Sequence, residues 1–582
     1  MEYIHDPLPP GDFLRILTIE YHGINNEPVV DFELRSLHDD APLAYTAISY
    51  AWEDHAPVRR VFSKDGRYIS LSATLSAFFD SQRSFCRIWV DALCIDQSRV
   101  AERNHQVNLM GQIYSKADRV LIWLGPGDEL ARRALGMLES GQPVKLHHKN
   151  VRKAVLRLLR CPWFTRVWVI QEALVNTTVL MSCGDCVIQF QSFADAEGTV
   201  LNLGNYTQNF KSSDPSYRGI NCARQIVIMR WQYQEHGHVP LTFLLQAVHQ
   251  FLASDPRDFI FAIRAIAQSA DLLPEADYAK TEEEVFQLAA SSILCSGRYV
   301  DLLALCGLGP RELGMQLTDS NSVTIKTGTS PKLPSWVPDF RFNSQHEPFG
   351  YADIASWNAG GPYLGEVTVS GHELHLRGQL IDYISEVGAV IRSWNSDSMC
   401  EVLEKAVEIA STRMNFGRTT VGEKLLLGCG RQTDLPESVL AMIARTLLLG
   451  IFNDGNQLEE DHSHFEDVLV DLRQSIELRQ VGIDGIGDKL VQRLRLRSDN
   501  MKMFGGENGT IGLSKRMTQP DDVVCLFPGC RFPFIIRPNQ GRQSLSPTSK
   551  PLQGQLIGWC YVDGMMTGEG LNSELKRTFV LT

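Results

Sequence analysis

The sequence has no surplus of basic residues and no long apolar run. It holds 56 Lys and Arg against 68 Asp and Glu, which gives a formal net charge of -12. Phosphate binding needs a basic face, so this balance argues against nucleic acid as the main partner. The most apolar stretch, Val439–Phe452, is short and contains Arg445, which predicts a buried helix and no membrane anchor.

Signals for secretion, phosphate binding and metal binding are also missing. The N-terminus, MEYIHDPLPPGDF, lacks a basic-then-apolar pattern, and the 13 cysteines are odd in number. We therefore expect reduced thiols and a cytoplasmic protein. Neither a GxxxxGK[ST] loop nor a GxSxG elbow occurs. Cys183 and Cys186 have CxxC spacing but no second ligand pair, so we predict a hairpin turn and no metal site.

What is present first is an alternation of strand and helix signals. Strand patterns at residues 45–51, 87–91 and 119–124 alternate with helical ones at 72–81 and 102–117, and a long helix is predicted over about 151–175. This order predicts an α/β domain whose sheet is mostly parallel, with flanking helices. A mainly helical region should follow at 196–335, and a C-terminal mixed α/β, strand-rich region at 336–582. The latter includes a low-complexity, disordered-like loop at 538–555.

The clearest candidate for chemistry is Glu172, in the stretch CPWFTRVWVIQEAL. On one continuous helix Phe164, Trp168 and Glu172 would form a single stripe, and no cation lies three or four places from Glu172. A carboxylate beside Trp in apolar surroundings tends towards a raised pKa, which suits a catalytic acid. The alternative is a solvated glutamate at the edge of a structural helix.

A second candidate is Asp91, which ends the strand RIWVD. Side chains just beyond strand ends lie where open α/β sheets bind ligands. Ser49, Tyr50 and Trp52 also lie at a strand end, that of YTAISYAW. The rings of Tyr50 and Trp52 offer surfaces on which a flat base can stack. Asp96 is better explained as a cap for the following helix.

Three blocks together resemble the fungal heterokaryon-incompatibility (HET) domain. They are YTAISYAW (45–52), RIWVDALCIDQSRVAERNHQVNLMGQIYSKADRVLIWLG (87–125) and CPWFTRVWVIQEALV (161–175). SDPRDFIFAI (254–263), LPSWVPDF (333–340) and IGWCYVDGMMTGEG (557–570) are similar to segments of large HET proteins. The resemblance implies a HET domain at 1–195 with its core at about 40–190, a fungal source, and a role in non-self recognition and programmed cell death.

The HET domain is in turn held to be a distant relative of TIR domains. That likeness implies a TIR- or flavodoxin-like fold, with Glu172 as the catalytic carboxylate of an NAD glycohydrolase. It also implies a nucleotide site formed by Ser49, Tyr50, Trp52, Asp91, Arg103 and Trp168. NAD would be a substrate, and no cofactor is implied. Two residues depart from the common HET pattern: Glu53 stands where Gly is usual, and Asp96 where Asn is common.

Two functions therefore stay open at this point. One is a nucleotide-cleaving enzyme whose activity triggers cell death. The other is a non-enzymatic signalling module, in which the HET domain self-associates and the long C-terminal region senses an incompatibility partner. In the second case Glu172 is only structural.

Overall fold

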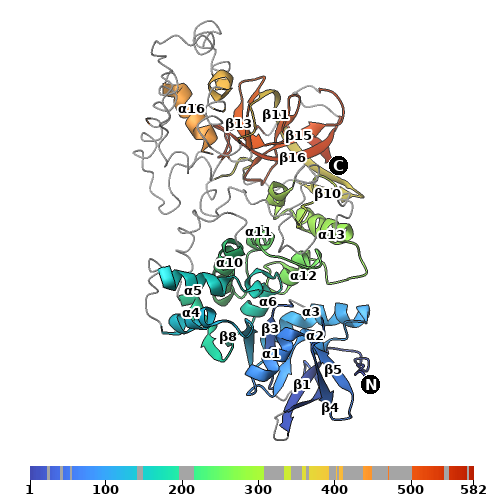
Figure 1. Ribbon diagram of the computed structural model, residues 1–582. Helices are drawn as coiled ribbons and strands as arrows, with labels where there is room; N and C mark the ends of the chain where they lie inside the picture. Colours follow the sequence, from blue (N-terminus) through green and yellow to red (C-terminus); the bar gives the residue numbers. More distant parts are fainter. Residues whose placement is uncertain are drawn as a thin grey trace. The chain divides into compact units, whose positions relative to one another are not determined.

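The structure is a computed structural model (Figure 1). It describes most residues of 1–306 and of 501–582, and shorter stretches between these two ranges. The described residues are 1–22, 27–39, 43–52, 56–140, 149–195, 215–306, 333–341, 357–361, 366–391, 405–410, 437–448, 501–542, 550–572 and 576–582, with single residues at 402, 470 and 498. They form two compact units, one of residues up to 289 and one of residues from 290 on. The finer boundaries at 195 and 335 stay predictions.

The first unit contains a nine-stranded sheet. Its strands are β1 Phe13–His22, β2 Glu27–Ser36, β3 Thr46–Tyr50, β4 Arg59–Ser63, β5 Tyr68–Leu71, β6 Arg87–Trp89, β7 Arg119–Trp123, β8 Val179–Cys183 and β9 Cys186–Gln189. Its helices are α1 Ala73–Ser81, α2 Asp91–Cys94, α3 Val100–Lys116, α4 Glu129–Glu139, α5 Lys149–Leu159, η1 Pro162–Thr165, α6 Val169–Leu174, α7 Phe190–Asp195, α10 Pro215–His236, α11 Leu241–Ala247, η2 Val248–Gln250, α12 Asp258–Arg264 and η3 Ala270–Leu272. Helix α13, Glu282–Cys295, follows.

The sheet is mixed, which corrects the prediction of a mostly parallel one. Its order is β5-β4-β2-β1-β6-β3-β7-β8-β9, and the β1–β2, β1–β6, β4–β5 and β8–β9 pairs are antiparallel. The central run β6-β3-β7-β8 is parallel. Within that run the strands lie in the order 2-1-3-4, as in doubly wound sheets of the flavodoxin type. The long β1–β2 hairpin, which the sequence analysis did not predict, adds two of these antiparallel pairs, β1–β2 and β1–β6.

Strand β3 lies at the centre of the parallel run and all five of its residues are buried. Its near-continuous burial is typical of a parallel strand covered on both faces. Helix α6 contacts both β3 and β7, and also α3, α10 and α12 (Figure 1). The order of the strands reverses between β3 and β7, so α6 lies where doubly wound sheets usually place their ligands.

The predicted long helix over 151–175 is wrong. Helix α5 ends at Leu159, a 3-10 turn spans Pro162–Thr165, and α6 begins only at Val169. Pro162 has no backbone N–H to continue the helical ladder, so a break at this point has a local cause. As a result Phe164, Trp168 and Glu172 do not form one helical stripe.

The second unit is built mainly of antiparallel strands. Its elements are η4 Val300–Leu305, β10 Val367–Ser370, β11 Glu373–Val387, α16 Glu437–Leu447, β12 Met501–Gly506, β13 Ile511–Lys515, β14 Val523–Leu526, β15 Pro533–Pro538, β16 Leu552–Val562 and β17 Lys576–Leu581. The pairings β11-β12-β13-β16-β15-β14 return to β11 and close the sheet on itself. Strand β16 begins at Leu552, inside the predicted loop 538–555.

Closure gives this unit a single apolar interior. Its core holds the buried side chains of Ile384, Phe504, Val524, Ile535, Ile557, Cys560 and Val562. Each comes from a strand of the closed path, and a closed sheet leaves few unpaired strand edges. Among the described residues no helix is long and apolar enough to cross a bilayer.

Candidate functional site

The candidate site begins with a hydrogen-bonded chain at the end of β3. The Ser49 hydroxyl donates to Oε2 of Glu172, and Nε1 of Trp163 donates to Oγ of Ser49 at 2.7 Å. All three side chains are buried, with Ser49 and Trp163 fully inaccessible and Glu172 1% exposed. Strand β3, turn η1 and helix α6 thus bring together residues more than a hundred positions apart.

Burial governs the acidity of Glu172. Removal from water raises the pKa of this carboxyl from 4.5 to about 7, and the Asp91 carboxylate adds to the rise. The Arg166 guanidinium and the hydrogen bond from Ser49 act in the opposite direction. The expectation of a raised pKa is therefore confirmed. Near neutral pH such a carboxyl exists in both protonation states, which suits proton transfer.

Arg166 is the cation that the sequence analysis missed. Its guanidinium donates to the Tyr50 carbonyl, and its charge lowers the pKa values of Glu172 and Asp91. It lies six positions before Glu172, outside the helical spacing considered from the sequence. The break between η1 and α6 is what brings it close.

Asp91 begins α2, just beyond β6, as its sequence position predicted. Its Oδ1 accepts from Nε1 of Trp52 at 3.3 Å and from its neighbour Ala92 N–H at 2.7 Å. Burial raises the pKa of Asp91, against the effect of Arg166. The Tyr50 and Trp52 rings lie 6.4 Å apart between centroids. Ser49, Tyr50, Trp52, Asp91 and Glu172 are thus brought into one cluster.

The cluster has an inner and an outer part. Ser49, Tyr50 and Glu172 are buried, whereas Trp52, Asp91, Arg166 and Trp168 are partly exposed. The outer residues therefore carry the surface that a ligand would meet first. The unusual Glu53 lies outside the described residues.

Trp168 and Arg103 lie beside this cluster and are joined to it through residues that the sequence analysis did not single out. The Trp168 indole acts as a donor that lowers the pKa of the buried Asp258 carboxyl, against the effect of burial. Tyr278 also donates to Asp258, at 2.7 Å, and the Arg103 guanidinium lies 4.3 Å from the centroid of the Tyr278 ring. Asp258 lies in SDPRDFIFAI (254–263), which the sequence analysis compared with segments of large HET proteins. No pattern in that segment predicts a contact with Trp168.

Two other predictions concern residues near the sheet. The prediction that Asp96 caps the next helix is wrong, because the N-cap residue of α3 is Arg99. Asp96 instead accepts from Ser98 N–H at 3.0 Å, within the turn before α3. Cys183 and Cys186 face each other across the β8–β9 hairpin, which confirms the predicted hairpin turn, and both are free thiols.

The cluster lies in a part of the chain that matches a known protein family. The family model described as heterokaryon incompatibility protein (HET) matches residues 45–172, which begin just before β3 and end at Glu172. A second model, the Het-6 beta-barrel domain, matches residues 485–582, a range that includes strands β12 to β17. Residues 45–172 thus form a domain that matches the heterokaryon-incompatibility family, and residues 485–582 match a domain named after a heterokaryon-incompatibility protein.

A full-length relative is similar along almost the whole chain. Heterokaryon incompatibility protein 6, OR allele, of Neurospora crassa is 22% identical over 645 aligned positions, covering 93% of this chain and 92% of the relative. No solved structure matches. The TIR likeness of the fold therefore stays a prediction.

Proposed function

We propose that this protein acts in fungal heterokaryon incompatibility, in the cytoplasm, and that the Ser49–Glu172 cluster is its functional centre. The matched HET domain and the full-length relative support the incompatibility role. The single observation that supports a centre at this place is the buried Glu172 carboxyl, with a pKa near 7, at the carboxyl end of β3. Burying an acid destabilises its ionised form, and carboxyl groups with raised pKa values are common at functional sites. This one lies between β3 and β7, where the strand order reverses and where sheets of this kind bind ligands.

The chemistry proposed for this centre is cleavage of the nicotinamide–ribose bond of NAD. The bond between ribose C1′ and the ring nitrogen breaks, and its electron pair leaves with neutral nicotinamide. The ionised Glu172 carboxylate stabilises the positive charge that develops on the ribose. Water then bonds to C1′ and loses a proton to Glu172, which gives ADP-ribose and nicotinamide.

The outer residues of the cluster supply binding groups for this substrate. Trp52 and Trp168 are partly exposed aromatic rings on which a flat base can stack, and Arg166 offers a cation for the diphosphate. Asp91 is an acceptor for a ribose hydroxyl. Tyr50 is buried and supports the cluster from within.

The burial of Glu172 also favours the second candidate function. With 1% of its surface exposed, the carboxyl meets no substrate unless the outer residues move. In a non-enzymatic signalling module the same Ser49–Glu172 contact would serve only to join α6 to β3. Self-association through the HET domain and partner sensing by the C-terminal region would then carry the function.

One substitution separates the two candidates. Purified full-length protein and its Glu172→Gln variant are assayed for NAD loss, and both are expressed in a fungal host and scored for growth arrest. Glu129→Gln is the matched control, because Glu129 is an exposed glutamate at the start of α4.

The enzymatic proposal expects NAD loss and growth arrest from the wild type and the control, and neither from Glu172→Gln. Turnover by the wild type should rise with pH through about 7, because the ionised carboxylate is the active form. Growth arrest by Glu172→Gln without NAD turnover would refute the enzymatic proposal and support the signalling module.

A further inference from the structure

Asp258 begins helix α12, far in the sequence from the residues matched by the HET family. It is a buried carboxyl that accepts from the Tyr278 hydroxyl at 2.7 Å, and the Trp168 indole acts on it as a donor that lowers its pKa. Burial raises its pKa to about 6, although both hydrogen bonds and the Arg166 charge act to lower it. A buried acid of this kind is costly to keep unless its partners are held in place.

Two cations lie close to the Tyr278 ring. The guanidinium of Arg103, from α3, lies 4.3 Å from the ring centroid, and that of Arg257 lies 5.2 Å from it. Arg257 donates to the backbone carbonyl of Tyr278 at 3.0 Å and is paired with Asp255 at 2.6 Å. Cation–aromatic contacts of this kind restrict the ring, so the hydroxyl has a fixed direction towards Asp258.

Two asparagines of α3 fix the chain that carries Tyr278. Asn104 accepts from Tyr278 N–H at 3.0 Å, and Asn108 both accepts from Ala276 N–H at 2.8 Å and donates to the Ala276 carbonyl at 3.2 Å. Helix α3 belongs to the matched HET range. The segment around Tyr278 is therefore attached to the HET domain by backbone-specific contacts.

Backbone contacts also join the Arg166 segment to the chain before α12. Leu252 N–H donates to the Thr165 carbonyl at 2.6 Å, and Val167 N–H donates to the Leu252 carbonyl at 2.9 Å. These bonds flank Arg166 on both sides. One step further on, Glu172 N–H donates to the Trp168 carbonyl at 3.2 Å. Residues outside the matched range thus hold the stretch that presents Arg166, Trp168 and Glu172.

We infer that Asp258 is a positioning residue of the candidate site, and that Tyr278 orients it. The carboxylate fixes the Trp168 indole on the outer side of the cluster and so sets the surface that meets the nucleotide. The inference rests on the proposed function for the identity of that ligand, whereas the positioning itself is measurable without any activity. The functional HET site then extends from Ser49 to at least Tyr278.

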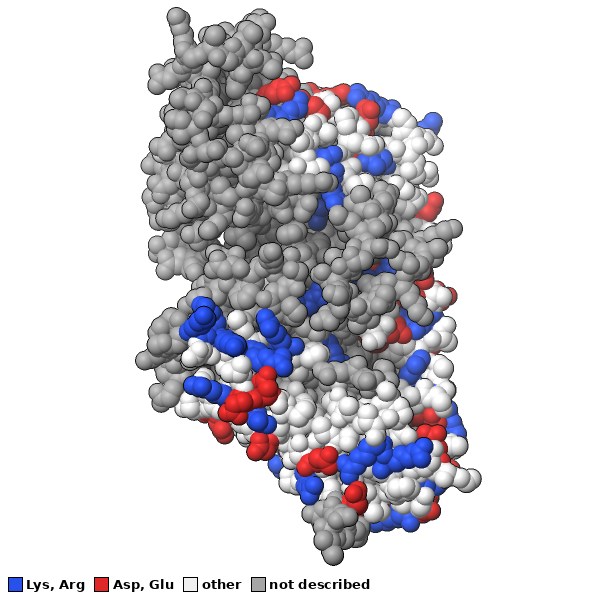
Figure 2. Space-filling model, viewed as in Figure 1, with Lys and Arg blue, Asp and Glu red and all other residues white. Residues whose placement is uncertain are grey.

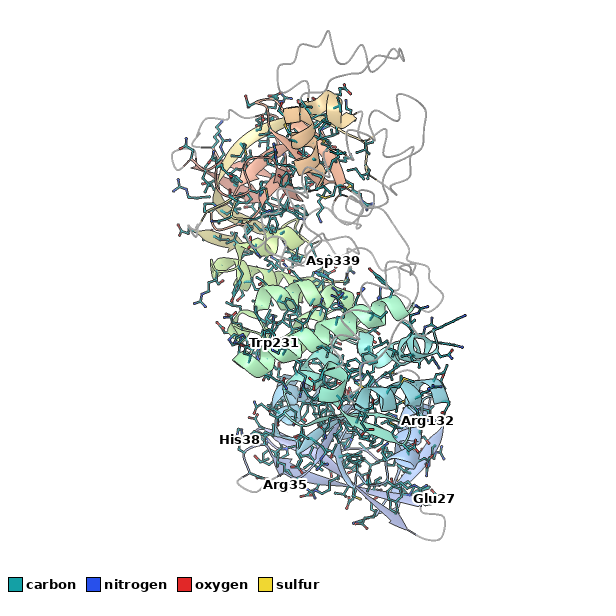
Figure 3. All side chains as sticks on the ribbon, turned by 90° about the vertical axis from the view of Figure 1, so that its left-hand side faces the viewer. Glu27, Arg35, His38, Arg132, Trp231 and Asp339 are labelled. Carbon is teal, nitrogen blue, oxygen red and sulfur yellow. The ribbon has the colours of Figure 1, made fainter. Side chains whose placement is uncertain are left out.

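The test follows Trp168 by ¹⁹F NMR in full-length protein labelled with 5-fluorotryptophan. The chain has ten tryptophans, so the Trp168 resonance is assigned with Trp168→Phe. Trp231, which is 63% exposed on the surface of α10, gives a reference signal from a ring in solvent (Figure 3). The variants are Asp258→Asn and Tyr278→Phe, with Asp271→Asn, an exposed aspartate between them, as control.

In the wild type and in Asp271→Asn the Trp168 resonance should shift with pH, with a midpoint near 6, because its hydrogen-bond acceptor titrates there. Asp258→Asn should abolish this shift and leave Trp231 unchanged. Tyr278→Phe should move the midpoint upwards, because the lost hydrogen bond favoured the ionised carboxylate. A Trp168 resonance that keeps the same titration in Asp258→Asn overturns the inference.

NAD turnover separates this inference from the proposed function. If the wild type cleaves NAD, Asp258→Asn should raise KM by about tenfold, since a charged hydrogen-bond partner of Trp168 is lost. If Asp258→Asn leaves both KM and the Trp168 titration unchanged, the positioning role is refuted and the enzymatic proposal is not. Absence of turnover in every protein refutes the enzymatic proposal, and the Trp168 titration then still decides the positioning role.

Discussion

Replacing Glu172 by glutamine should stabilise the first unit at alkaline pH and leave its stability unchanged in acid. Burial raises the carboxyl pKa from 4.5 to about 7. For an acid whose pKa is raised on folding, the unfolded chain ionises first. The free energy of unfolding therefore falls as pH rises from about 4.5 through 7.

The size of the effect follows from the two pKa values. A difference of about 2.5 pKa units, at about 1.4 kcal/mol per unit, corresponds to on the order of 3 kcal/mol above pH 7. Glutamine cannot ionise, and its amide oxygen can still accept the Ser49 hydroxyl. The variant should therefore escape this loss, so that the gap between the two proteins opens between pH 5 and 8.

Hydrogen exchange of peptides covering β3 and β7, in increasing urea, measures this free energy for the unit in question. Glu102→Gln is the matched control, and it should change the free energy of unfolding in the opposite direction. Although burial acts to raise it, the pKa of Glu102 is held below its usual value by hydrogen bonds from Arg15, whose Nη2 lies 3.1 Å from Oε2. This control should lose about 3–5 kcal/mol at pH 8, and the loss should shrink in acid.

Two results would refute the reasoning. A stability difference between the wild type and Glu172→Gln that is the same at pH 5 and pH 8 would mean that Glu172 does not titrate with a raised pKa. Destabilisation by Glu172→Gln at pH 8 would mean that the ionised carboxylate is the form that the fold favours. In either case the proposed acid–base role of Glu172 would lose its physical basis.

The remaining predictions concern packing around the same sheet. Ser49→Ala removes the acceptor of the Trp163 indole and should cost about 1–3 kcal/mol in urea unfolding; a change under about 0.5 kcal/mol would show that the contact is replaceable. Gly219→Ala places a methyl group 1.9 Å from the Leu159 carbonyl oxygen and should cost at least about 1–3 kcal/mol. Gly136→Ala, a helical glycine with open space around it, is the control and should stabilise slightly.

The surface adds little to these expectations. Figure 2 shows acidic and basic side chains close together on the visible face of the described residues. Exposed ion pairs such as Lys64–Glu20, at 2.7 Å, join side chains that stay about half in water. Pairs of this kind contribute little to stability, so the buried groups of the cluster dominate the predicted pH dependence.

The sequence by itself determined the local elements and several members of the site. The helix predicted over 72–81 and the strands at β3, β6 and β7 follow from apolar periodicity, and all are present. The placement of Ser49 and Asp91 at neighbouring strand ends follows from the same pattern. The sequence is enough to predict these elements, because each helix or strand depends on residues only a few positions apart.

Only the tertiary structure decided which groups meet. The antiparallel β1–β2 hairpin and the contribution of β11 to the closed sheet depend on pairing between distant segments, which periodicity cannot specify. The break between η1 and α6 brings Arg166 close to Glu172. The contacts of Asp258 with Trp168 and Tyr278 join segments about 20 to 90 positions apart. Burial, which raises the pKa of Glu172 to about 7, is likewise a property of the assembled fold.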